Sequence, residues 1–284
     1  MEHCFCHIRG GKLLLHGFTY KSIDEIKHPI IKEVLKSYNV EPRLEIASHA
    51  DIPDGTGLGS SSSFSVALIK AISFYTRHQH TPEDLAIGAC DIEINRLKEP
   101  IGKQDQYAAA FGGLTSFTFH KDDTVEVRPL KVASDTLHSL EDDLLLFFTG
   151  YSRSASAVLS EQKTKSESMD KDMIANLDFT KELGLQSKKA LEKGDLKEFA
   201  HLLNVHWENK KKRSKNMSKS AIDQAYDVAR NNGALGGKLI GAGAGGFLMF
   251  YTKEHALLRS AMTKLKLEEV RFKYDFEGAK VIST

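Results

Sequence analysis

The sequence predicts an α+β fold that is divided into two portions, and two observations lead to this prediction. Segments with strand-like alternation and segments with helical spacing follow one another along the chain, and no internal repeat relates them. A continuous apolar run, DLLLFFTG, has the length of a buried strand, and the stretch before it, near Ser134–Glu141, marks a boundary. We therefore expect domains at residues 1–134 and 135–284, each with its own helices and strands.

The composition is that of a globular chain without a bias toward a charged or apolar partner. Of its 284 residues, 41% are hydrophobic and 27% are charged, and the formal net charge is +1. This balance gives no attraction to nucleic acid or to an anionic membrane. No apolar run approaches the ~18 residues of a membrane span, and the amino terminus lacks the features of a signal peptide. Three cysteines form no disulfide framework and favour a reducing compartment, so we expect a cytoplasmic protein.

The first segment, EHCFCHI, alternates like a half-buried strand. Its cysteines and histidines are also possible metal ligands. On a strand, however, Cys4 and Cys6 point to one face while His3 and His7 point to the other, so the ligands are separated. We favour the strand, with a metal site as the alternative. A second strand is expected at Leu44, Ile46 and the residues that follow, where apolar residues alternate.

A glycine-rich stretch, PDGTGLGSSSS, follows this strand and precedes a helix. Six apolar residues after it recur at helical spacing: Phe64, Ala67, Leu68, Ala71, Ile72 and Tyr75. Glycines at a helix start let a phosphate approach the first backbone N–H groups, which have no partner within the helix and carry partial positive charge. One glycine suffices for a tight turn capped by a serine, whereas three at alternate positions favour an anion site. The lysine followed by serine or threonine that closes a P-loop is absent after Gly59.

Two helices, two strands and a pair of carboxylates are expected between residues 81 and 131. TPEDLAIGACDIEINRL predicts a helix with Thr81 as its cap and Pro82 at its first position. DQYAAAF, closed by two glycines, predicts a short helix, and LTSFTF and TVEVRPL predict strands. Glu93 and Asp105 are placed so that they could converge on one pocket, as phosphoryl transfer requires: one oxygen ligand for Mg²⁺ and one carboxylate for the proton of the attacking hydroxyl. The alternative is that Glu93 is a solvated helix residue and Asp105 only an N-cap.

The carboxyl-terminal half begins with the buried strand at DLLLFFTG and continues as mostly charged helices to about Asn231. GGFLMFYT and EVRFKYDF then predict strands. Alternate residues of the last segment share one face: Val270, Phe272, Tyr274 and Phe276. GAGAGG, at residues 241–246, fits the dinucleotide-binding pattern G-x-G-x-x-G by letter. It precedes a strand instead of following one, so we do not expect a dinucleotide site.

Three stretches in this order, PDGTGLGSSSS, IGKQDQYAAAFGG and KLIGAGAGGFLMF, resemble the second motif, the catalytic-aspartate segment and the third motif of the GHMP small-molecule kinases. That superfamily includes galactokinase, homoserine kinase, mevalonate kinase and phosphomevalonate kinase. The flanking text, GKQDQYAAAFGG, TGYSRSAS and GALGGKLIGAGAGGF, is most similar to the D-glycero-D-manno-heptose 7-phosphate kinases. The resemblance covers essentially the whole chain.

The resemblance implies the two-domain GHMP kinase fold. Its N-terminal, ATP-binding domain resembles domain 2 of ribosomal protein S5, its C-terminal domain is ferredoxin-like, and the active site lies in the cleft between the two. The resemblance further implies an ATP- and Mg²⁺-dependent kinase that phosphorylates a hydroxyl of a sugar or sugar phosphate, with heptose 7-phosphate as substrate and the 1,7-bisphosphate as product. The partners are then small molecules, with neither nucleic acid nor membrane, and association into a homo-oligomer stays open.

The resemblance also assigns site residues by position. The loop that would wrap the ATP phosphates comprises Pro53, Gly55, Thr56, Gly57, Leu58, Gly59, Ser60, Ser61 and Ser62. Ser61 and Glu93 would hold Mg²⁺, and Asp105 would act as the base toward the sugar hydroxyl. The substrate side would comprise Lys103, Gln104, Arg153, Gly241, Gly243, Gly245 and Gly246.

A phosphate group on the sugar would need cationic contacts. The candidates are Arg153, Lys103, Lys238 and the run NKKKRSK at residues 209–215. A guanidinium fork suits phosphate, so Arg153 is our first choice. We interpret the lysine run as a solvated helix end and Trp207 as a packing residue.

The family's first motif is a proline- and glycine-containing hairpin that carries a basic residue near the catalytic aspartate. Nothing in MEHCFCHIRGGKLLL matches it, so the sequence predicts an N-terminal domain that lacks this motif. The alternative function is therefore a weakly active or non-catalytic nucleotide- or sugar-binding protein of the same fold.

Overall fold

The computed structural model describes residues 4–10, 14–15, 18–40, 44–52, 55–151, 156–214 and 217–282. The chain packs as two compact units, each built from more than one segment of the sequence. Unit 1 comprises Met1–Asp54, Gly59–Arg128 and Tyr274–Thr284, and unit 2 comprises Gly55–Leu58 and Pro129–Lys273. The predicted boundary at residues 134/135 lies near the passage from Arg128 to Pro129, and the division into family domains at that point remains a prediction.

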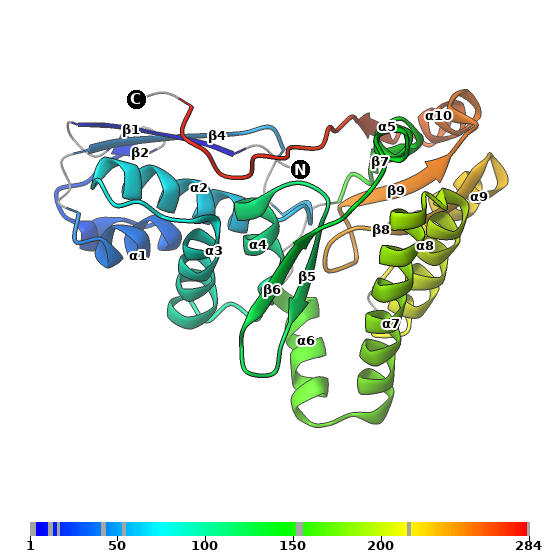
Figure 1. Ribbon diagram of the computed structural model, residues 1–284, viewed down its shortest axis with the longest axis horizontal. Coiled ribbons are helices and arrows are strands. Elements are labelled where there is room, and N and C mark those ends of the chain that lie inside the picture. The colour runs from blue at the N-terminus through cyan, green and yellow to red at the C-terminus, as the bar shows by residue number, and fades with distance from the viewer. Residues whose placement is uncertain are drawn as a thin grey trace. The chain divides into compact units, whose positions relative to one another are not determined.

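Unit 1 combines helices with pairs of strands (Figure 1). The described strands are β1 (Cys4–Gly10), β2 (Leu14–Leu15), β3 (Phe18–Thr19), β4 (Leu44–Ala50), β5 (Thr115–Phe119) and β6 (Val125–Pro129). The described α-helices are α1 (Pro29–Ser37), α2 (Ser60–Tyr75), α3 (Pro82–Cys90) and α4 (Gln104–Phe111). β1 pairs with β4, β2 with β3, and β5 with β6. The strands predicted at EHCFCHI, at Leu44 and Ile46, at LTSFTF and at TVEVRPL are confirmed over their described residues. Glu2 and His3 of the first segment lie outside the described residues.

Local signals set where the helices of unit 1 begin. The Asp84 N–H donates to the Thr81 hydroxyl over 3.1 Å, and the Thr81 N–H donates to the Asp84 carboxylate over 2.8 Å, so α3 starts with a capping box. Pro82 occupies the first helical position, where a missing N–H costs nothing. α2 begins directly after the glycine loop. The three helices predicted in this region are confirmed.

The core of unit 1 is centred on β4 and α2. Leu44, Leu68 and Ile72 are fully buried in it. The buried face of α2 differs from the predicted stripe, because Ser65, Val66 and Ile69 are buried whereas Tyr75 is 46% exposed. The reason is that β1, α1, α3 and α4 all pack against this helix.

Unit 2 contains an antiparallel sheet in the order β10-β7-β9-β8 (Figure 1). Its strands are β7 (Leu144–Phe148), β8 (Ala234–Leu239), β9 (Phe247–Thr252) and β10 (Glu268–Val270). Its described helices are α5 (Ser134–Asp143), α6 (Ser156–Glu167), α7 (Lys171–Lys193), α8 (Leu196–Lys211), α9 (Ser220–Asn231) and α10 (His255–Lys264). Numbered along the chain, the strands lie in the order 4-1-3-2 with helices in the first and third connections, which is the ferredoxin-like arrangement. The predicted strands at DLLLFFTG and GGFLMFYT are confirmed.

An apolar stripe along α8 builds the core of unit 2. Leu196, Ala200, Leu203 and Trp207 recur at spacings of four, three and four, and each is at most 9% exposed. Trp207 is fully buried, with its ring centroid 6.2 Å from that of Tyr226. The interpretation of Trp207 as a packing residue is confirmed.

The strand predicted at EVRFKYDF is wrong beyond Val270. β10 pairs with β7 only over Glu268–Val270. The chain then joins unit 1, where the Gly113 N–H donates to the Asp275 backbone oxygen over 2.6 Å, next to the end of α4. Phe276 is 58% exposed. The alternating residues therefore belong to an extended segment that packs beside a helix end.

The longest described helix, α7, has 23 residues and is rich in charge. Nowhere in the described ranges is a helix both long enough and apolar enough to cross a membrane.

Gly236 of β8 lies directly against α8, since a Cβ atom at this position would lie 1.7 Å from the Ala200 backbone oxygen. We expect Gly236→Ala to lower the free energy of unfolding by about 1–3 kcal/mol or more, because two backbones would have to separate. Urea denaturation measures this change. Gly184→Ala is the control, because nothing lies within 4 Å of a Cβ atom added there in the middle of α7. It should stabilise the protein by roughly 0.5–1 kcal/mol. Equal stabilities of the two variants would contradict the close approach of β8 to α8.

Candidate active site

The glycine loop adopts a conformation that glycine takes without strain. Gly55, Gly57 and Gly59 have φ angles of +77°, +83° and +79°. Gly59 occupies the N-cap position of α2 and offers no side chain to cap it. The amino-terminal end of α2 therefore keeps the partial positive charge of its first N–H groups, as an anion site needs.

Asp105 lies beside the end of this loop, within unit 1. It is the second residue of α4, whose N-cap is Lys103, so the alternative that Asp105 is only an N-cap is wrong. A Cβ atom added to Gly59 would lie 3.2 Å from both Cβ and Cγ of Asp105. The last glycine of the loop and the predicted base are thus in direct contact.

The surroundings of Asp105 favour a base. The residue is exposed, yet protein atoms crowd its carboxyl group, and this partial burial raises the pKa of Asp105 above its ordinary value. A carboxylate with a raised pKa holds a proton more readily. It is therefore better suited to accept one from a substrate hydroxyl.

Glu93 is held inside unit 1 on a π-helical turn, Asp91–Arg96, that continues α3. It is 1% exposed, and its Oε2 accepts hydrogen bonds from the Ser62 hydroxyl over 3.1 Å and from the Gln106 amide over 3.0 Å. Burial raises the pKa of Glu93, and the hydrogen bonds from Ser62 and Gln106 oppose part of this rise. The alternative that Glu93 is a solvated helix residue is wrong.

The residues around Glu93 fit a divalent cation in their charge. The other carboxylate oxygen, Oε1, is buried without a hydrogen-bond partner among the described residues. A cation would compensate this costly arrangement. Within the described ranges no three His, Cys, Asp or Glu side chains form a metal cage, which suits Mg²⁺ because Mg²⁺ is usually held by one or two carboxylates and by substrate phosphates. Ser61 is exposed in the first turn of α2, and Ser62 is the serine that contacts Glu93.

The third glycine stretch forms the turn between β8 and β9 in unit 2. A Cβ atom on any of four glycines would lie within 2.8 Å of another residue: Gly241, Gly243, Gly245 and Gly246. Two of these contacts involve the first part of the glycine loop, since Gly241 faces Gly57 and Gly246 faces Thr56. The third stretch therefore packs against the loop that is predicted to wrap phosphate.

Four other predicted site residues have no side-chain contact with the glycine loop, Glu93 or Asp105 that the described structure shows. Pro53 and Arg153 lie outside the described residues, and their roles remain predictions. The Lys103 ammonium group lies 2.5 Å from Asp123 Oδ1, and Gln104 is exposed as the first residue of α4. The assignment of both to the substrate side also remains a prediction.

The interpretation of the lysine run as a solvated helix end is wrong for Lys210. This side chain is 6% exposed, and its ammonium group donates to the backbone oxygens of Leu239 and Gly241. The sequence carries a signal for this burial. Lys210 follows Trp207 by three positions and so extends the apolar stripe of α8.

The fold and the site together define a small-molecule kinase. The family model of the GHMP kinases N-terminal domain matches residues 25–113, and that of the GHMP kinases C-terminal domain matches residues 187–267. The chain belongs to the GHMP kinase family, whose members use ATP as the phosphate donor.

Relatives at two levels of similarity support this assignment. D-glycero-alpha-D-manno-heptose 7-phosphate kinase of Campylobacter jejuni is 32% identical over 260 residues, which cover 90% of this chain and 76% of the relative. The crystal structure of a D-glycero-D-manno-heptose 1-phosphate kinase from Bacteroides thetaiotaomicron matches with a TM-score of 0.74 and 28% identity, covering 99% of this chain and 88% of that one. The crystal structure of galactokinase from Lactococcus lactis matches with a TM-score of 0.75 and 16% identity, covering 98% of this chain and 86% of that one. At this identity the match shows the fold alone.

Proposed function

We propose that this protein transfers the γ-phosphoryl group of ATP to a hydroxyl of D-glycero-D-manno-heptose 7-phosphate, giving the 1,7-bisphosphate. The observation that carries the proposal is the contact between Gly59, at the start of α2, and Asp105. This contact sets a helix end that can bind the phosphates of ATP, the phosphoryl donor, next to a base that can act on the hydroxyl of the acceptor. The choice of a heptose phosphate is supported by the names of two relatives that are 32% and 28% identical to this chain.

In the proposed reaction Asp105 accepts the proton of the sugar hydroxyl. The hydroxyl oxygen forms a bond to the γ-phosphorus, and the bond between that phosphorus and the bridging oxygen of ADP breaks. The N–H groups at the start of α2 hold phosphate oxygens in place while this happens. Gln106 and Ser62 hold Glu93 in position beside them.

Ser61 and Glu93 are the residues that would hold Mg²⁺ in this proposal. When bound, Mg²⁺ neutralises part of the charge on the transferred phosphoryl group. The assignment of Glu93 is supported by its buried Oε1, which has no hydrogen-bond partner among the described residues. The assignment of Ser61 is supported by its place in the first turn of α2, next to Ser62, which contacts Glu93.

Ser61→Ala and Glu93→Gln should each raise the Mg²⁺ concentration needed for half-maximal activity, because each removes one oxygen ligand. The two effects should not add, since both act on one ion. A titration of initial rate with Mg²⁺ measures them. Ser63→Ala, two positions further along α2, serves as the control and should leave the Mg²⁺ dependence unchanged. An unchanged Mg²⁺ dependence in both site variants would show that the metal is held elsewhere.

The substrate is tested with a panel of acceptors in a coupled assay for ADP. We expect kcat/KM for heptose 7-phosphate to exceed that for galactose, fucose and mevalonate by at least ~100-fold, because a site with partners for a phosphate rejects acceptors that lack it. A preference for another acceptor would replace the proposed substrate. Binding of ATP without transfer to any acceptor would favour the alternative, a non-catalytic nucleotide- or sugar-binding protein.

A cytoplasmic location belongs to the same proposal. It is supported by Cys90, a buried cysteine without a disulfide, and by an ATP-dependent activity. Association into a homo-oligomer remains a prediction, which sedimentation of the purified chain tests.

A further inference from the structure

Three basic side chains of α8 and its end lie on one face of the helix. His206, Lys210 and Arg213 are spaced by four and three positions, which places them above one another. A fourth comes from the neighbouring strand. Gly236 of β8 faces α8, and Lys238, two positions further on, projects to the same side of the sheet. We call these four residues the α8–β8 basic cluster.

The positive charge of this cluster is not balanced by acidic residues. Among the described residues, no carboxylate oxygen lies within 4.0 Å of the nitrogens of Lys210, Lys238 or Arg213. Within the described part of the chain, Lys210 donates to backbone oxygens, and Arg213 donates to Asn176 Oδ1 over 2.7 Å and to the Thr180 hydroxyl over 2.6 Å. All of these partners are neutral.

The pKa values of the cluster reflect this imbalance. Burial, together with the charges of Lys238 and Arg213, lowers the pKa of Lys210 to about 7. The same causes, burial and then Arg213, lower the pKa of Lys238 to about 8, although part of its side chain remains accessible. Burial and the neighbouring positive charges lower the pKa of His206 to about 3, so His206 is neutral at physiological pH.

A cluster of this kind is costly without an anion. Buried charges are normally paired, and an uncompensated one destabilises the protein strongly. The carboxyl-terminal end of α8 carries partial negative charge, which stabilises the cations of Lys210 and Arg213 in part. Lys238 comes from a strand and does not belong to that helix end. The side chain of Lys238 is half-buried, and its ammonium group has no hydrogen-bond partner among the described residues. A bound anion would supply both the missing charge and the missing partner.

The cluster lies beside the loops that are predicted to meet phosphate. Lys210 contacts Gly241 of the third glycine stretch, and Gly241 contacts Gly57 of the glycine loop. All three belong to unit 2. The unbalanced charge is therefore close to backbone that the family resemblance places near the substrates.

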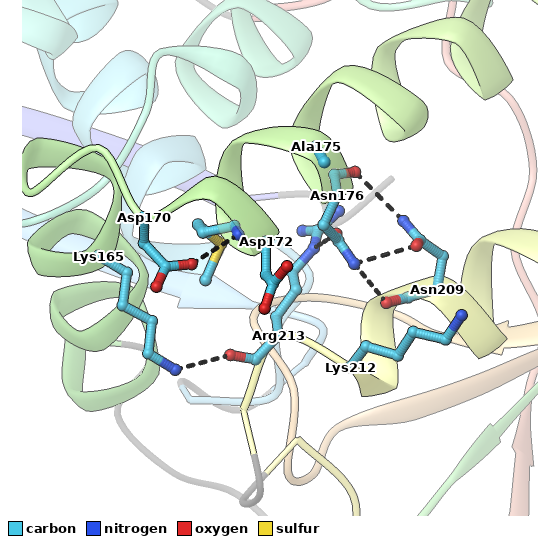
Figure 2. A pocket seen from close by; sticks show the side chains of 9 residues that line it. Lys165, Asp170, Asp172, Ala175, Asn176, Asn209, Lys212 and Arg213 are labelled. Carbon is cyan, nitrogen blue, oxygen red and sulfur yellow. Dashed lines mark hydrogen bonds between the residues drawn. The ribbon is translucent and has the colours of Figure 1, made fainter.

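The neighbouring cavity, which Arg213 also lines, carries acidic side chains as well as basic ones (Figure 2). This cavity, of about 530 Å³, lies between α7 and the end of α8. The Asn176 amide donates to the backbone oxygen and Oδ1 of Asn209 over 2.8 and 3.0 Å, and it accepts from Arg213. These bonds join the two helices. The carboxylates of Asp170 and Asp172 also line the cavity and would repel an anion, so the anion is sought on the Lys238 side of Arg213.

We propose that Lys210, Lys238 and Arg213 form a binding site for a phosphate monoester group. Positively charged nitrogen donors from three residues suit a phosphate dianion. The proposal rests on the proposed function, in which one substrate is a sugar phosphate and the other a nucleotide. Either could supply the phosphate.

Titration of the full chain with inorganic phosphate, followed by calorimetry, tests the site without turnover. We expect the wild type to bind phosphate and Lys238→Met to bind it roughly 10- to 100-fold more weakly, as for one lost charged hydrogen bond. Lys212→Met is the matched control, because this exposed lysine of the same run lies outside the cluster, and it should bind as the wild type does. No binding by the wild type, or equal binding by Lys238→Met, would overturn the proposal.

Thermal unfolding and steady-state kinetics of the same variants complete the test. Removing an unbalanced charge should leave the Tm of Lys238→Met unchanged or higher; a lower Tm with unchanged phosphate affinity would make Lys238 a packing residue and overturn the site. A raised KM for heptose 7-phosphate assigns the phosphate to the sugar, and a raised KM for ATP assigns it to the nucleotide. If the wild type transfers no phosphoryl group, the proposed function fails while the phosphate titration still decides the site.

Discussion

Replacing Asp105 with asparagine should lower kcat by roughly 100-fold or more, because asparagine keeps the shape of the side chain but accepts no proton from the sugar hydroxyl. The affinity for ATP should change little, since Asp105 faces the end of the glycine loop with its carboxyl group and does not support the loop through a hydrogen bond in the described structure. Rapid mixing of enzyme, ATP and heptose 7-phosphate measures the chemical step directly.

Asp122→Asn is a suitable control for this variant. Asp122 is an exposed carboxylate in the turn between β5 and β6, where it accepts hydrogen bonds from Thr124. Its replacement should leave the rate unchanged. If Asp105→Asn transfers phosphate as fast as the wild type, Asp105 is not the base.

Gly59→Ala should lower kcat/KM by roughly 100-fold through a displacement of Asp105. The added methyl group would lie 3.2 Å from the Asp105 carboxyl carbon, and a shift of a catalytic group by a fraction of an ångström to 1 Å has effects of this size. Steady-state kinetics with both substrates measures the loss.

Gly150→Ala separates this contact from backbone strain. Gly150 has a φ angle of +76°, nearly that of Gly59, but nothing lies within 4 Å of a Cβ atom added there. Both variants should lose about 1 kcal/mol of stability, because alanine resists a positive φ angle. Only Gly59→Ala should lose activity. Equal losses of activity in the two variants would mean that strain, and not contact with Asp105, is the cause.

The local elements could be predicted from the sequence because their signals are local. The glycine loop and α2, the capping box of α3, and the buried strand β7 each follow from a few neighbouring residues. The segment after Val270 shows the limit of such signals. Its alternation is that of a strand, but β10 ends where the chain leaves the sheet, and only tertiary structure decides that point.

The candidate site was predictable in its residue types and not in its contacts. Glu93 and Asp105 follow from the chemistry of phosphoryl transfer, whereas the approach of Gly59 to Asp105 depends on how α2 packs against α4. Charge was misleading in the lysine run, because a row of cations is usually solvated. Lys210 is buried since it continues the apolar stripe that ends with Trp207.

The central claim is that this chain moves a phosphoryl group from ATP to a hydroxyl of a sugar phosphate. Phosphorus NMR of the enzyme with ATP, Mg²⁺ and heptose 7-phosphate tests it most directly, because it resolves ADP, inorganic phosphate and each phosphate ester in one spectrum. We predict ADP and a second phosphate ester on the heptose, at the anomeric carbon, in equal amounts and without inorganic phosphate. The appearance of inorganic phosphate in step with ADP, or no consumption of ATP at all, would contradict the claim.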